Sequence, residues 1–256
     1  MRRIGIDEMA VLKGHNYVIV VSDLDTSKVL WVGPDRTKET LEGFFASLPP
    51  GVPGQIEAIA MDMWQPYRTI CRKWIPNAED KIVLDRFHVE KHLNEAVDAV
   101  RRQEQRELAA EGHNDLKGTR YIWLYRPENL PPTYQRKEFE DLRNSNLRTA
   151  RAWAIKEQFQ RLWYSRYAGC ARRSFEDWYE WATKSQLEPM KNAAQRLRNH
   201  LPRILNSIRH GVTNARAEGI NTKIQTIKRK AYGFRSLPRF VNAVYFHCAG
   251  LRLHPL

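Results

Sequence analysis

Two aspartates, Asp7 and Asp62, each follow a short apolar run that is typical of a buried strand. We expect Asp7 at the end of the first strand and Asp62 at the end of the run AIAM. Carboxylates on adjacent strands can share hard divalent cations through their oxygens. Two-metal phosphoryl transfer needs such a pair, because one ion activates an attacking water or 3′-hydroxyl while the other stabilises the leaving oxygen. Each aspartate alone could be a turn former or a helix N-cap, so the prediction rests on the pair.

A third carboxylate, Glu218, lies in a predicted helix near the end of the chain. At about 100° per residue this helix has an apolar stripe and a polar face. The apolar stripe comprises Ile220, Ile224, Ile227 and Ala231. The polar face comprises Asn214, Glu218, Asn221, Gln225 and Arg229. Glu218 is the only acid on its face, although it could be an ordinary solvent-facing residue. If the stripe packs on a sheet, Glu218 points away from it, so catalysis requires the helix to lie at the sheet edge.

Positive charge is concentrated after the first third of the chain. The formal net charge is +13. Residues 1–85 hold 10 basic and 12 acidic side chains, whereas the remainder holds 32 and 17. A basic surface attracts polyanions by releasing their counterions, which favours nucleic acid over a small neutral substrate. The residues that we expect to contact DNA phosphates are Asn221, Lys223, Lys228, Arg229, Lys230 and Arg235.

Cysteine usage and hydropathy indicate a cytoplasmic protein. Cys71, Cys170 and Cys248 are far apart and form no Cys-x-x-Cys pair, so neither a disulfide framework nor a zinc finger is expected. The sequence has no apolar stretch long enough to cross a bilayer, and its first residues lack the apolar region of a signal peptide. We therefore predict no membrane association.

Hydrophobic periodicity predicts the order β-β-β-α-β-α-β-α for the first part of the chain. The expected strands are 3–7, 17–24, 28–32, 56–61 and 81–84, and the expected helices are 37–47, 64–74 and 87–111. The predicted class is α/β, with a ribonuclease H-like mixed sheet in which a three-stranded antiparallel meander is extended by crossover strands. Two final helices are expected at 213–231 and 237–251, with Gly233 as a helix stop and Pro238 as a helix start.

The region between these parts is helical and rich in tryptophan. It contains five of the eight tryptophans, namely Trp123, Trp153, Trp163, Trp178 and Trp181. These rings could stack on bases, but aromatic residues at helical spacing usually form a core. The predicted domains are residues 1–111 and 211–256 as the two parts of the core, with 112–210 as an all-α insertion.

The segment Asp85-Arg86-Phe87-His88 follows the last predicted strand and offers two accessory candidates, Asp85 and His88. Asp85 could instead cap the next helix. His88 and His92 have the i, i+4 spacing that can bind a transition metal. Two histidines without further ligands are more often structural or surface residues.

Four blocks of the chain resemble the DDE transposases of bacterial insertion sequences, in particular the ISL-three family. These blocks are IGIDE, AMDMWQPY, DRFHV and TNARAEGINTKIQTIKRKAYGF. The resemblance implies that Asp7, Asp62 and Glu218 form the catalytic and metal-binding triad, with two Mg²⁺ ions that Mn²⁺ can replace. It also implies hydrolysis of DNA at the element ends, joining of the freed 3′ ends to target DNA, and a homo-oligomer on DNA in a bacterial cytoplasm.

Members of this family usually begin with a zinc-binding segment and a helix-turn-helix region, and we expect both to be absent here. An alternative is therefore a truncated, catalytically silent module that binds DNA or a full-length transposase and inhibits transposition. A third reading is another nuclease of the same fold, such as a ribonuclease H or a Holliday-junction resolvase, because fold alone does not fix function.

Overall fold

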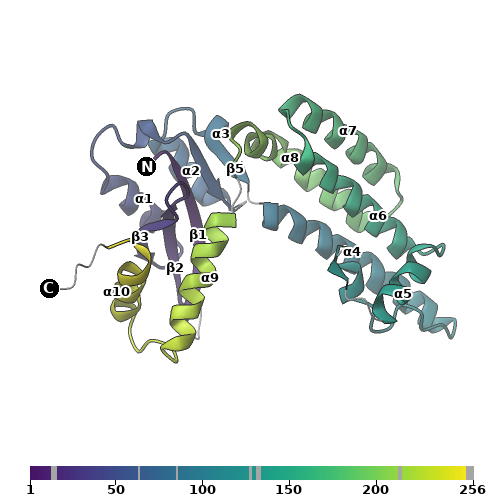
Figure 1. Ribbon diagram of the computed structural model, residues 1–256. Helices are drawn as coiled ribbons and strands as arrows, with labels where there is room; N and C mark the ends of the chain where they lie inside the picture. The colour runs from purple at the N-terminus through teal and green to yellow at the C-terminus, as the bar shows by residue number, and fades with distance from the viewer. Residues whose placement is uncertain are drawn as a thin grey trace. The chain divides into compact units, whose positions relative to one another are not determined.

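The described residues form a five-stranded mixed sheet and ten α-helices (Figure 1). The computed structural model describes residues 1–12, 16–62, 64–84, 86–126, 129–130, 134–212 and 215–251. The strands are β1 (Arg3–Leu12), β2 (Asn16–Asp23), β3 (Lys28–Pro34), β4 (Ala58–Met61) and β5 (Ile82–Leu84). Their order across the sheet is β3-β2-β1-β4-β5. The pairs β1–β2 and β2–β3 are antiparallel, whereas β1–β4 and β4–β5 are parallel.

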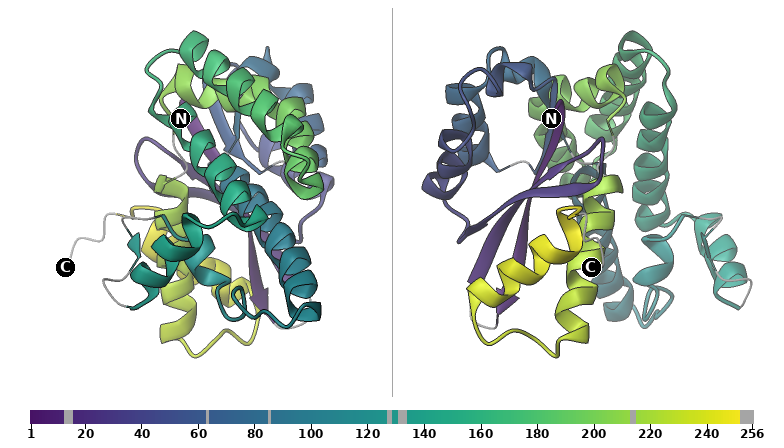
Figure 2. Two further views of the ribbon diagram at one scale, coloured as in Figure 1. Left: turned by 90° about the vertical axis from the view of Figure 1, so that its right-hand side faces the viewer. Right: turned by 60° about the vertical axis from the view of Figure 1, so that its left-hand side comes forward.

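Side chains alternate between the two faces of the sheet, and each face has its own apolar cover. Ile4 and Ile6 of β1 belong to a cluster with Phe45 and Tyr67. Met9 belongs to a second cluster on the other face. The helices that cover the first face are α1 (Lys38–Ala46) and α2 (Gln65–Trp74). The helices that cover the second face are α9 (Ala215–Lys230) and α10 (Leu237–Cys248), which lie side by side in Figure 2.

The chain divides into two compact units, residues 1–86 with 202–256, and residues 87–201. The remaining elements of the first unit are the short helix α3 (Ala78–Lys81) and a 3₁₀ turn, η1 (Pro53–Gln55). The elements of the second unit are α4 (Arg86–Ala110), η2 (Tyr121–Trp123), α5 (Tyr134–Arg143), α6 (Arg148–Gln160), η4 (Arg161–Tyr164) and α7 (Ala168–Lys184). Helix α8 (Glu188–His210) begins in the second unit and ends in the first.

The second unit has an aromatic core joined by buried polar contacts. Trp123, Trp153 and Trp178 are buried, as predicted, whereas Trp181 is 40% exposed. The buried Glu104 of α4 accepts hydrogen bonds from the backbone N–H of Arg148, at 2.7 Å, and of Thr149, at 2.7 Å. These bonds satisfy two of the donors that every helix N-terminus leaves open, so α4 is tied to the start of α6.

Helix α4 therefore packs with the second unit, while the sequence placed residues 86–111 in the first domain. The predicted division into a two-part core and an all-α insertion domain at 112–210 remains a proposal. The mixed α/β class is confirmed, and the strand order is compatible with the predicted ribonuclease H-like fold.

Two local predictions need correction. Strand β1 runs on to Leu12 beside β2, so Asp7 lies in the middle of a strand and not at its end. Helix α9 packs on β1, in the middle of the sheet order, and not at a sheet edge. Helix α9 ends at Lys230 and α10 begins with Pro238 in its first turn, as expected from Gly233 and Pro238. Within the described residues no helix is long and apolar enough to cross a membrane.

Candidate active site

Asp7 lies on the face of the sheet that α9 covers. It is opposite Val20 of β2, and its neighbours Ile6 and Glu8 point to the other face. The side chain is partly buried. Its Oδ1 accepts a hydrogen bond from the backbone N–H of Glu8 at 2.7 Å. The carboxylate is thus held at the junction between β1 and the helix above it.

The parallel pairing of β1 with β4 brings Asp62 level with Asp7. The paired residues are Ile4 with Ile59 and Gly5 with Ala60. Two positions further come Asp7, still within β1, and Asp62, the first residue after β4. Neighbouring strands are about 4.8 Å apart, and residues two positions apart share a face. If the register is extended by two residues past its last pair, the two aspartates fall on the side of the sheet where Ala58 and Ala60 cluster with Ala217 of α9.

Helix α9 can pack closely on β1 because residue 5 of the strand is a glycine. A Cβ atom at Gly5 would lie 3.3 Å from Cβ of Ala217 and 3.0 Å from Oγ of Ser22. Figure 1 shows α9 running along β1. Further along the same helix, Lys228 Nζ donates to the carbonyl of Ala10 at 3.0 Å. The glycine in the IGID motif thus leaves space for Ala217 of α9 beside β1.

Asn221 of α9 contacts Asp7 directly. Its Nδ2 donates a short hydrogen bond to Oδ2 of Asp7. Sequence reasoning assigned Asn221 to DNA contact, and that role stays a prediction. The signal for the contact that the structure shows was the position of Asn221, three residues after Glu218 and on the same flank of the helix.

Glu218 is exposed on α9, one turn before Asn221. Ile220 and Ile224 of the same helix are buried against the sheet, so Glu218 points away from it, as the helical pattern predicted. In the described part of the chain, no three His, Cys, Asp or Glu side chains gather closely enough to hold a metal ion. The parallel pairing of β1 and β4 thus directs Asp7 and Asp62 toward the same end of the sheet, whereas Glu218 lies on the exposed side of α9.

Trp64, which precedes helix α2, belongs to an aromatic and ionic cluster that the sequence did not reveal. The guanidinium of Arg36 lies 5.6 Å from the ring centre of Trp64 and 5.1 Å from that of Tyr17. It also forms an ion pair with Glu8 at 2.9 Å. Trp64 packs edge-on against Tyr67 at 4.6 Å. Burial, followed by the charge of Glu8, raises the pKa of the Tyr67 hydroxyl.

Comparisons with known proteins show the family to which the chain belongs. A family model for DDE transposases of the ISL3 type, described as a transposase, matches residues 4–244. The chain belongs to this transposase family. It is 35% identical over 240 residues to the transposase for insertion sequence element IS1001 of Bordetella parapertussis. It is 27% identical over 275 residues to the transposase for insertion sequence element IS1557 of Mycobacterium tuberculosis.

The two alignments cover 93% and 98% of this chain, but only 58% and 61% of the two relatives. The chain therefore spans about three fifths of the length of the curated relatives. No solved structure gives a significant match.

The basic residues predicted to bind DNA lie on different sides of α9 and in the turn after it. Lys223 Nζ donates to the carbonyl of His247 at 2.5 Å, on the side facing α10, whereas Lys228 reaches β1. Lys223 is exposed nonetheless, as are Arg229, Lys230 and Arg235. Arg229 and Lys230 lie in the last turn of α9, Arg235 lies in the turn after it, and such exposed cations suit a phosphate backbone.

The two accessory candidates in this transposase family member are Asp85 and His88. Asp85 lies outside the described residues. His88 is partly buried in α4. His92 lies one turn later, with Nδ1 at 3.1 Å from Arg196 and 3.4 Å from Glu95. The predicted roles of Asp85 and His88 stay open.

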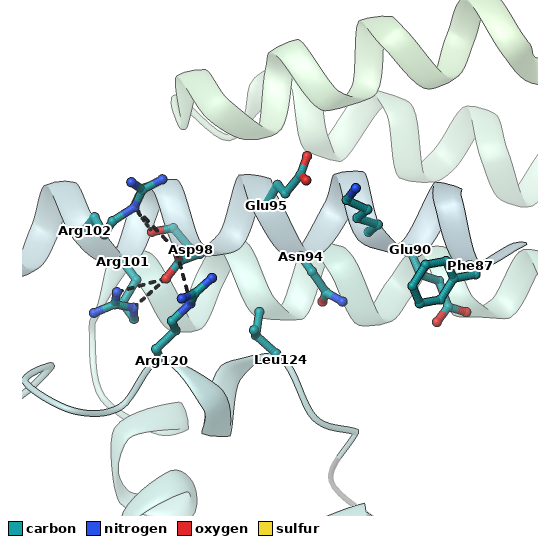
Figure 3. A pocket seen from close by; sticks show the side chains of 10 residues that line it. Phe87, Glu90, Asn94, Glu95, Asp98, Arg101, Arg102, Arg120 and Leu124 are labelled. Carbon is teal, nitrogen blue, oxygen red and sulfur yellow. Dashed lines mark hydrogen bonds and ion pairs between the residues drawn. The ribbon is translucent and has the colours of Figure 1, made fainter. Parts of the chain in front are cut away.

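The second unit contains a cavity of about 580 Å³ along α4. Figure 3 shows three arginines converging on the Asp98 carboxylate. Their distances to it are 2.9 Å for Arg101, 3.4 Å for Arg102 and 3.6 Å for Arg120. The cavity is also lined by Lys91, Glu90 and Glu95, so its basic and acidic side chains nearly balance. Balanced charge gives it little attraction for a polyanion.

Proposed function

We propose that the chain is the catalytic part of a DNA transposase that cleaves element ends and joins them to target DNA at an Asp-Asp-Glu site. The observation that supports this proposal is the parallel pairing of β1 with β4, whose last pair, Gly5 with Ala60, lies two residues before Asp7 and Asp62. Membership of the transposase family supports it. The same proposal assigns to this chain the transposase activity of the longer relatives, DNA as its partner, and assembly on paired ends.

Carboxylate oxygens are the ligands that Mg²⁺ and Mn²⁺ prefer, so the Asp7–Asp62 pair fits a divalent ion. Two ions bound there would activate an attacking water or 3′-hydroxyl and stabilise the leaving oxygen of a phosphodiester. In this proposal Asp7 contributes from a strand that is paired on both sides, and Asp62 contributes from the position directly after β4.

In this proposal Glu218 of α9 is the third carboxylate of the Asp-Asp-Glu site. Its neighbour Ala217 packs on Gly5, and Asn221, three residues on, contacts Asp7. A long side chain at this position has the reach to turn toward the aspartates when phosphate and metal are present. The exposed residues Arg229, Lys230 and Arg235 hold the DNA backbone nearby.

The test is a comparison of Asp62→Asn with Asp35→Asn. The first variant removes a metal-binding charge, so magnesium-dependent DNA cleavage should fall by at least about a hundredfold while DNA binding is retained. Asp35 is exposed and has a positive φ that asparagine tolerates, so the second variant should cleave normally. Equal cleavage by Asp62→Asn and the unmodified chain would remove the proposed site.

A catalytically silent DNA-binding module is the second candidate. It is favoured by the finding that, within the described residues, no three candidate metal ligands converge. This candidate predicts salt-sensitive DNA binding without cleavage under any metal condition. A strand-transfer product from the isolated chain excludes it.

A further inference from the structure

The turn between α9 and α10 carries a tyrosine in an unfavourable backbone conformation. Tyr232 has φ 51°, in the left-handed region that glycine normally occupies. Its N–H donates to the carbonyl of Arg229 at 3.0 Å, and the N–H of Gly233 donates to that of Lys228 at 3.0 Å. This pair of bonds is the usual end of an α-helix, in which the left-handed position is most often glycine.

The tyrosine side chain gains nothing from packing to offset this conformation. Its relative exposure is 101%, so the ring projects fully into solvent. Phe234, two residues later, turns inward and packs edge-on against Phe240 at 5.4 Å between ring centres. A left-handed tyrosine is less stable than glycine because its Cβ crowds the following carbonyl. An exposed ring kept at such a position serves a contact outside the chain.

Charge around the ring identifies the kind of partner. The sequence has no Asp or Glu after Glu218. The last turn of α9 is Lys228-Arg229-Lys230, and Arg235 and Arg239 follow the turn. A planar ring in a segment that has several basic and no acidic side chains matches a polyanion that also presents flat aromatic groups. Nucleic acid has both features.

We propose that Tyr232 stacks on an unpaired base of DNA whose backbone is held by the basic residues around it. The inference rests on the proposed function and adds a contact to it. Stacking accepts any base, because every base has a π face. A base inside an intact duplex already stacks on its neighbours, so the ring requires one that is displaced or left unpaired at a nick or an end.

The experiment compares a fully paired DNA duplex with the same duplex carrying a one-base bulge, both measured by fluorescence anisotropy. The unmodified chain should prefer the bulged duplex by about tenfold. Tyr232→Gly should lose this preference, and Tyr232→Phe should keep it. The salt dependence should be the same in all three, because no cation is removed. The Tm of Tyr232→Gly should be unchanged or higher by about 2 °C.

Tyr164→Ala is the matched control, because Tyr164 is also an exposed tyrosine, at 71%, and lies in the second unit. It should keep the preference for the bulge. Retention of the preference by Tyr232→Gly, or a drop in its Tm of several degrees, overturns the inference. Tight binding of the paired duplex with no preference in the unmodified chain overturns it too, while leaving the proposed function intact. No salt-sensitive binding to either duplex overturns the DNA interface of the proposed function itself.

Discussion

Asp7 is the residue on which the account of the site depends, and both of its oxygens are already engaged. Oδ1 accepts from the backbone of Glu8 and Oδ2 from the amide of Asn221. Each carboxylate oxygen has two lone pairs, so it can accept a hydrogen bond and also bind a metal ion. The two donors restrict the orientation of the carboxylate, and we propose that Asn221 positions Asp7 in this way.

Removing the Asn221 amide should weaken metal binding without unfolding the protein. For Asn221→Ala we expect Mn²⁺ affinity to fall by about tenfold, since partners that orient a metal ligand typically contribute that much. Mn²⁺ titration followed by electron paramagnetic resonance measures this directly. Gln225→Ala, one turn later on the same flank, is the control and should bind Mn²⁺ normally. Equal affinities for the two variants would show that Asn221 does not position Asp7.

At this scale the sequence predicted which carboxylates to consider but not how they are held. Apolar runs before Asp7 and Asp62 indicated their strands, because burial on both faces leaves a continuous apolar pattern. The contact of Asn221 with Asp7 depends on how α9 is rotated on the sheet. Rotation is set by the packing of Ile220 and Ile224, and a helical wheel gives only the relative directions of side chains.

At the scale of elements, the crossing of α9 over β1 at Gly5 determines where Asn221 and Glu218 lie. A larger side chain at Gly5 would meet Ala217 and Ser22. Gly5→Val should therefore lower the free energy of unfolding by about 1 to 3 kcal/mol, as overpacking does, and should also reduce cleavage. Chemical denaturation measures the first effect.

Gly43→Ala in α1 is the matched control, because a Cβ there meets nothing within 4 Å. Alanine replaces glycine in the interior of an exposed helix face, so stability should rise by about 0.5 to 1 kcal/mol. If both substitutions raise stability, α9 does not pack tightly on β1.

Element types were more predictable than element ends. The apolar run before Asp7 indicated β1, but the length of β1 depends on pairing with β2 as far as Leu12, which local sequence does not encode. The four-residue helix α3 follows Asn77, at φ 54°, and is too short for a periodic signal. The helical wheel predicted the buried stripe of α9 correctly, because an amphipathic helix on a sheet must bury its apolar side.

At the scale of the whole molecule, charge divides the chain into an acidic beginning and a basic remainder. The Asp7–Asp62 pair lies in the first 85 residues, which hold 10 basic and 12 acidic side chains. The α9–α10 region supplies positive charge in the same compact unit. The proposed metal-binding carboxylates and the proposed phosphate-binding cations thus belong to one compact unit although they lie far apart in the sequence.

DNA binding should therefore depend on salt through particular residues of α9. Arg229→Ala removes one exposed cation, so the slope of the logarithm of affinity against the logarithm of salt concentration should become shallower by about 1. Anisotropy titrations at several salt concentrations give this slope. Lys38→Ala is the comparison, because Lys38 is exposed on α1, which covers the opposite face of the sheet. An equal change in both variants would mean that net charge, and not the α9 surface, governs binding.

The most direct test of the central claim is anomalous diffraction from crystals of the chain soaked in Mn²⁺. The account predicts a peak about 2 Å from carboxylate oxygens of both Asp7 and Asp62, with a second ion about 4 Å away when DNA is bound. Asp62→Asn crystals should lose the first peak. Mn²⁺ bound elsewhere in the chain, with the Asp7–Asp62 pair empty at saturating metal, would contradict the proposal that these two aspartates form the catalytic site.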